Sequence, residues 1–277
     1  VVASLDLPKT SFTDLVSSIP KEYAPDLDGI PLDGYLTLGV KLNDDSVKTT
    51  GFVAEINGQK INLEIAASQI FEKIVEIDLQ IDSRELVVEK LLPPVTDTDK
   101  ESSPSKTSDK TEEIGPFAIP VDLAGKVRIG KATYNQVPLT DLALDLTLKD
   151  NILKVNNLSA AVAGGKMNNT ARVDLNIKGL AYKAGIGIEG VKGRVMVGMF
   201  KPDLADSVHG TVGGEMTLSG AGTQPETVKK NLSGNGTFRL ANGKLQSIPA
   251  LDTVAALLKV GELREIVLDD GIVQFTV

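Results

Sequence analysis

Cysteine is absent from the 277 residues, so disulfide bonds and thiolate chemistry are excluded. Tryptophan is also absent, and aromatic residues make up only 4% of the chain. Leucine, isoleucine, valine and alanine must therefore form its apolar surfaces. Sugars and single-stranded nucleic acids bind by stacking on aromatic side chains, so both ligand classes are disfavoured.

Positive charge is scarce as well. The formal net charge is −8, and no segment concentrates lysine and arginine into a stripe that neutralises a phosphate backbone. We expect no nucleic-acid partner. No apolar run has the length of a membrane span, so the chain as it stands is expected to be soluble. It starts at Val1 and stops on strand-like sequence, which suggests a fragment that has lost a signal, an anchor or a further domain.

Catalytic and metal-binding signatures are missing. The single histidine, His209, has no second histidine with which to bind zinc and no nearby nucleophile motif, so we interpret it as an exposed loop residue. Gly185, Gly187 and Gly190 match G-x-G-x-x-G, but a strand or turn, not a helix, is expected to follow. We expect no catalytic residue, no metal and no cofactor, and hence no enzyme.

Three acidic pairs are candidates for acid and base chemistry. They are Asp44-Asp45, Glu112-Glu113 and Asp269-Asp270. Each lies in turn-like or linker sequence, where solvated carboxylates are ordinary. We interpret all three as surface charge.

Alternation of apolar and polar residues is the main pattern in the chain. It predicts a strand at Val75 to Ile81 and a hairpin in which Asn57-Gly58 joins two strands, residues 52–56 and 61–65. The clearest strand carries Leu142, Leu144, Leu146 and Leu148. The expected fold is mainly β with a few short helices, an antiparallel meander that forms a curved open sheet, a groove or a sandwich.

The chain divides into two expected units. Residues 1–92 form an N-terminal β unit with a short leading helix at 12–19, and residues 93–117, rich in Pro, Ser, Thr and charge, form a flexible linker. Residues 118–277 form a second β domain, truncated at its C-terminus. Within it we expect a helix at 225–232, with a capping box of Thr223 and Glu226, and a longer one at 249–261.

Several motifs of the second unit resemble the AsmA family. They are the opening V-D-L-x-G-x-V-x-I at Val121 to Ile129, the strand L-T-D-L from Leu139, the segment from Leu153 to Gly165, and the block Leu232, Gly234, Gly236, Thr237, Phe238, Asn242, Gly243 and Leu245. The stretch Ser83 to Pro93 also looks like the family's sequence before the linker. These are patterns of glycine and alternation, so they identify a fold family more firmly than a mechanism.

The resemblance implies a periplasmic protein of outer-membrane biogenesis in a Gram-negative bacterium. It also implies an inner-membrane anchor, an N-terminal helix absent from this chain, and kinship with bridges whose curved β-sheet forms an apolar groove for phospholipid. The expected partners are therefore phospholipid or another envelope lipid, together with outer-membrane assembly components.

A lipid groove needs a continuous apolar lining, because each methylene group left in water costs about 0.8 kcal/mol. The side chains that we assign to this lining are Leu142, Leu144, Leu146, Leu148, Val173, Leu175 and Ile177. Packing of the same residues in a sandwich core fits the pattern equally well. The alternative function is a module that assists assembly of outer-membrane proteins, in which an exposed sheet edge pairs with a client strand around a closed, dry core.

Overall fold

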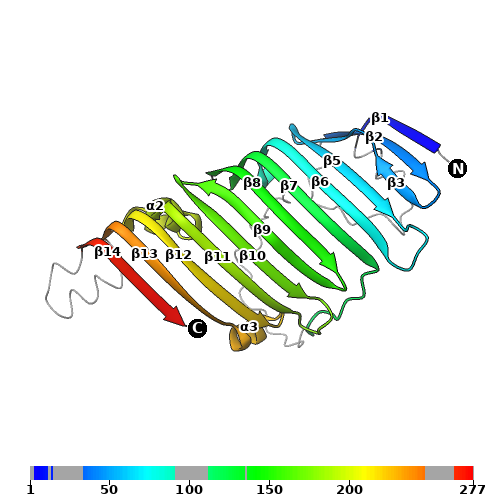
Figure 1. Ribbon diagram of the computed structural model, residues 1–277. Helices are drawn as coiled ribbons and strands as arrows, with labels where there is room; N and C mark the ends of the chain where they lie inside the picture. Colours follow the sequence, from blue (N-terminus) through cyan, green and yellow to red (C-terminus); the bar gives the residue numbers. More distant parts are fainter. Residues whose placement is uncertain are drawn as a thin grey trace, which may run out of the picture.

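A computed structural model describes residues 3–11, 14, 34–90, 112–134, 136–246 and 265–276. All of its strands belong to one 14-stranded sheet (Figure 1). The strands of the first part of the chain are β1 (Ala3–Ser11), β2 (Gly34–Asn43), β3 (Ser46–Thr49), β4 (Phe52–Ile56), β5 (Gln59–Ser68) and β6 (Val75–Val87), followed by the 3-10 helix η1 (Val88–Lys90).

The second part contributes eight strands and three short helical segments. The strands are β7 (Val121–Tyr134), β8 (Val137–Lys149), β9 (Ile152–Val162), β10 (Gly165–Asp174), β11 (Ala181–Lys192), β12 (Val208–Ala221), β13 (Ser233–Gln246) and β14 (Glu265–Thr276). The helical segments are α2 (Gly193–Phe200), η3 (Pro202–Ser207) and α3 (Pro225–Asn231). The expectation of a mainly β, open sheet is confirmed.

The strands follow one another across the sheet in chain order. β3 and β4 share one place between β2 and β5, interrupted at Thr50 and Gly51, where Gly51 has φ +77°. β6 and β7 pair in parallel, and the other neighbours pair antiparallel. This pairing joins the two expected units within one sheet, while the division of the chain into domains stays a prediction.

The β4–β5 hairpin is confirmed. Phe52 pairs with Leu63 and Ile56 with Gln59. Asn57 and Gly58 both have positive φ, as a type I′ turn requires. Its twist matches that of the flanking strands, so this short local signal determines the register.

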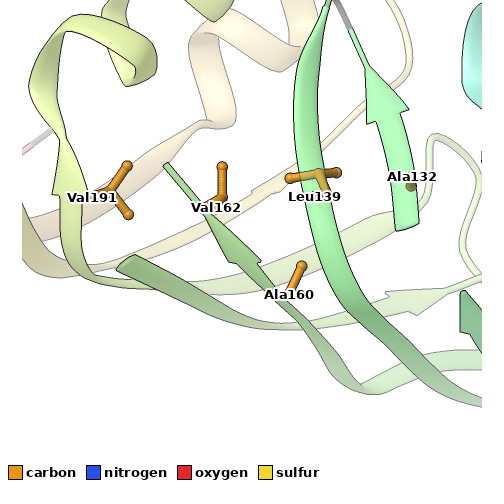
Figure 2. Packing of buried hydrophobic residues seen from close by; sticks show 5 residues of the cluster. All are labelled: Ala132, Leu139, Ala160, Val162 and Val191. Carbon is orange, nitrogen blue, oxygen red and sulfur yellow. The ribbon is translucent and has the colours of Figure 1, made fainter. Parts of the chain in front are cut away.

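The buried core lies near one end of the strands, which we call the α2 end. Its main cluster contains Ala132 of β7, Leu139 of β8, Ala160 and Val162 of β9, and Val191 of β11 (Figure 2). Met196 of α2 packs against it. α2 therefore covers one end of the sheet, and α3 lies at the opposite end of the strands (Figure 1).

A backbone irregularity at Asp141 brings two parts of β8 into this core. Asp141 has φ +52°, and the β8–β9 register shifts between Thr140 and Ala143. Leu139 and Leu142 therefore contact the same cluster although they are three residues apart, which strict alternation does not allow.

The helix predictions had mixed outcomes. α3 confirms the helix at 225–232, but the capping box is wrong, because the N-cap is Gln224 and no side chain caps it. The strand expected after Gly190 is present, because β11 continues to Lys192, but the expectation that no helix follows is wrong, because α2 begins at Gly193. The helices expected at 12–19 and 249–261 lie outside the described residues, apart from Asp14, which is helical.

Candidate functional site

One face of the sheet carries an apolar surface that continues from strand to strand. Residues paired between neighbouring strands place their side chains on the same face, so the register defines rows across the sheet. The row nearest the middle contains Leu63, Ile81, Val127, Leu144, Leu158, Asn169, Ile186, Met216, Gly236 and Phe275.

Two further rows lie beside it, toward the α3 end. One contains Ile65, Leu79, Gly125, Leu146, Val155, Ala171, Ala184, Leu218 and Gly234. The other contains Ala67, Ile77, Leu123, Leu148, Leu153, Val173, Tyr182 and Gly220. We call these three rows the apolar face. It extends from β5 to β14 and includes one amide side chain, Asn169, and one hydroxyl, Tyr182.

The large apolar side chains of this face are half-buried. Leu144, Leu146 and Leu148 each lie between the buried and exposed classes. The reason is that all described strands belong to a single sheet, so no second sheet packs on these side chains. The sandwich-core interpretation is thus wrong for the described residues, and the apolar face leaves hydrocarbon surface in contact with water.

The opposite face is polar and carries ion pairs between neighbouring strands. Arg128 Nη2 lies 2.6 Å from Asp145 Oδ1, and Arg239 binds both carboxylate oxygens of Asp270. The hydrogen bond from Arg128 lowers the pKa of Asp145. A shallow, open hollow of about 1000 Å³ is lined by Asn168, Glu215 and Thr237 of this face together with Ala160, Met167 and Ile188.

Five of the seven predicted lining residues lie on or beside the apolar face. Leu144, Leu146, Leu148 and Val173 belong to its rows, and Leu142 lies next to them against the core cluster. Leu175 and Ile177 do not belong to it, because β10 ends at Asp174. Both lie in the following turn, and Ile177 is exposed.

Sequence reasoning left most of the face out of the predicted lining. The omitted residues include Val127, Leu158, Ile186, Met216 and Phe275. Alternation within each strand is sufficient to predict which of its side chains share one side. It does not predict which residues of different strands form a row, because that depends on how the strands pair. A bulge on β9, where the register with β8 shifts between Asp145 and Leu146, changes the facing within β9, so that Leu158 and Val155 share one face although they are three residues apart.

The three acidic pairs have three different environments. Asp44 and Asp45 form the turn between β2 and β3, as expected. Asp269 and Asp270 lie within β14, so the turn prediction is wrong there, and Asp270 is paired with Arg239.

His209 is half-buried at the start of β12, where its Nε2 lies 3.0 Å from the Asp206 carbonyl oxygen. The prediction of an exposed loop histidine is therefore wrong.

Glu113 is held against the start of α3. Its Oε2 accepts hydrogen bonds from Thr223 Oγ1 at 2.6 Å and from the Thr223 amide at 2.5 Å. These bonds, with one from Thr227, lower the pKa of Glu113 from 4.5 to about 2. Although the sequence placed Glu113 in the linker, its carboxylate fastens residues 112–120 to the α3 end of the sheet.

The sign of this pKa shift predicts a pH-dependent stabilisation. Because the pKa is lowered on folding, the contribution is complete above about pH 4.5 and is lost as the pH falls toward 2. We expect Glu113→Gln to melt at a lower temperature than the parent protein at pH 7, and the difference to shrink between pH 4.5 and 2. Thermal unfolding monitored by circular dichroism measures this. Glu55→Gln, at an exposed position on β4, is the control with the same change of charge, and an equal loss there contradicts the prediction.

The described ranges contain neither a metal-binding cluster nor a membrane-spanning helix. No group of three His, Cys, Asp or Glu side chains there could hold a metal ion. No helix in the same residues is long and apolar enough to cross a membrane.

These features define a class of protein: a single-layer, mostly antiparallel sheet with one apolar and one polar face. The family model of the AsmA family matches residues 94–260, more than half of the chain. The chain belongs to the AsmA family, a bacterial envelope family, and this membership is consistent with a part in envelope or outer-membrane biogenesis. Neither the curated proteins nor the solved structures gave a match.

Proposed function

We propose that this protein binds phospholipid through the apolar face, with acyl chains lying across the half-buried rows and head groups left in water. The observation that supports this most directly is the continuity of the three rows over the strands from β5 to β14. Removing apolar surface from water stabilises by about 25 cal/mol per Å². An acyl chain can cover the apolar face in the place of the second layer that a single-layer sheet lacks.

The proposal includes no covalent chemistry. A phospholipid is bound and released unchanged, which agrees with the family's part in envelope biogenesis. A periplasmic location, with an inner-membrane anchor on the full-length protein, belongs to the same proposal and rests on the family resemblance. Fractionation of cells that express the full-length protein tests it, and recovery from the cytosol contradicts it.

The test is lipid extraction from the purified protein followed by mass spectrometry. We expect stoichiometric phospholipid with the parent chain and a loss of at least about tenfold with Leu144→Asp plus Leu146→Asp, because a carboxylate is poorly tolerated beside hydrocarbon. Thr147→Asp is the matched control, since Thr147 lies on the same strand but faces the other side of the sheet. Lipid-free parent protein, or equal lipid in all variants, contradicts the proposal.

A second candidate function rests on β14. This strand pairs with β13 alone among the described strands, and its residues Val267, Ile272 and Val273 are exposed. An exposed edge of this kind can pair with a strand of an outer-membrane client. The closed, dry core that we expected with this function is wrong, because the sheet is open. Crosslinking from Ile272 to an added client strand tests the pairing.

A further inference from the structure

Six large apolar side chains project from one end of the sheet, the end that carries α3. They are Phe71, Ile74, Ile114, Phe117, Ile119 and Ile177, and we call them the apolar rim. None belongs to a strand: they lie in the β5–β6 turn, in residues 112–120, and in the β10–β11 turn. Their exposed fractions range from 37% to 80%, with Phe71 the highest.

Backbone hydrogen bonds join these segments into one continuous edge. The amide of Val75, next to Ile74, donates to the Pro120 carbonyl at 3.1 Å. The Phe117 amide donates to the Leu175 carbonyl at 2.8 Å, and the Gly179 amide donates to the Ile114 carbonyl at 2.7 Å. The Glu113 carboxylate fixes the same stretch to α3. The three segments that carry the rim are therefore fixed to one another and to the α3 end of the sheet.

The rim also continues the apolar face. Val75 pairs with Val121 directly beyond the Ile77–Leu123 pair of the face, and no polar residue intervenes on that side of β6 and β7. Ile74 and Ile119 lie just past these valines in the chain. Apolar surface thus runs from the middle of the sheet to its end.

Shape and charge favour a lipid surface over a protein partner. The rim side chains are spread over three segments that connect strands, whereas a protein interface needs a packed, complementary patch. A bilayer interface accepts such side chains without shape complementarity, and phenylalanine and isoleucine insert there with their charged neighbours left in the head-group layer. Glu72 and Lys73 follow Phe71 in the chain, and Lys178 is paired with Glu112, so the rim has no excess of basic charge.

We propose that the apolar rim inserts into the interfacial layer of a phospholipid bilayer, so that the apolar face opens toward the acyl chains. This inference deepens the proposed function and rests on it for the role of the face. Insertion into the bilayer depends on the rim side chains alone and does not require lipid binding by the apolar face. With a net charge of −8 and no basic cluster at the rim, binding is expected to be as strong on zwitterionic as on anionic membranes.

The experiment is flotation with vesicles of phosphatidylcholine and phosphatidylethanolamine, using the parent chain and serine variants. Phe71→Ser plus Ile74→Ser, and separately Ile114→Ser plus Ile119→Ser, are expected to weaken binding by at least about tenfold, because serine cannot replace the lost apolar contact. Val267→Ser plus Ile272→Ser is the matched control: it removes two exposed apolar groups from β14, away from the rim, and is expected to leave binding unchanged.

Three results overturn the inference: parent protein that does not float, rim variants that float like the parent, or binding that needs anionic lipid and disappears in salt. Circular dichroism of each variant separates loss of binding from unfolding. Lipid content distinguishes the two proposals. Rim variants that no longer float but still carry extracted phospholipid support both, whereas floating protein that is free of bound lipid supports the rim alone.

Discussion

Replacing Leu139 by alanine is expected to lower the free energy of unfolding by about 2–5 kcal/mol, the largest loss for any single leucine of β8. Leu139 is 8% exposed and belongs to the core cluster with Ala132, Val162 and Val191. The substitution removes buried methyl groups and leaves a cavity in this cluster. Urea unfolding monitored by circular dichroism measures the change.

Leu146→Ala is the comparison for this prediction. Leu146 lies on the same strand, but it is half-buried on the apolar face. Only part of its side chain leaves water on folding, so we expect a loss of roughly 1 kcal/mol. Equal losses for the two variants, measured in lipid-free protein, would mean that the apolar face is a core rather than an accessible surface.

Gly165→Ala is expected to destabilise the protein by about 1–3 kcal/mol although it adds a single methyl group. A Cβ at this position would lie 2.2 Å from the Glu189 carbonyl oxygen and 2.4 Å from the Gly190 carbonyl carbon. Both atoms belong to the backbone of β11, so relief requires the two strands to separate where β10 begins. Thermal or urea unfolding measures the loss.

Gly213→Ala provides the matched control on β12. The nearest atom to a Cβ there is the Ile188 carbonyl oxygen at 3.6 Å, an ordinary contact. We expect a change within about 0.5 kcal/mol, because alanine fits and restricts the unfolded chain slightly. If both glycine variants lose stability equally, the close approach at Gly165 is not the cause.

Local patterns were sufficient for much of the fold. Alternation at Val75 to Ile81 and at Leu142 to Leu148 predicted strands that are present, and Asn57-Gly58 predicted the β4–β5 turn. The motifs of the second unit led to the AsmA family, and the family match covers residues 94–260. These features depend on neighbours in the chain, so they can be read from the sequence.

The linker prediction for Glu113 and the capping-box prediction for Thr223 could not be made correctly from local sequence. Glu113 had the composition of a solvated linker residue, and Thr223 had the spacing of a capping box. The two residues instead bind each other across 110 positions of the chain. A contact of that separation has no local signal, because the parallel β6–β7 connection brings residues 112–120 to the α3 end of the sheet.

The sequence by itself determined that the chain forms strands with one apolar side, that it belongs to a β-rich envelope family, and that Leu144, Leu146 and Leu148 share a face. Only the tertiary structure decided that this face is left open and the core lies at the α2 end. The reason is that alternation specifies which side of a strand is apolar but not what covers it. Whether a second layer packs on that side depends on how all the strands pair, and here every described strand joins one sheet.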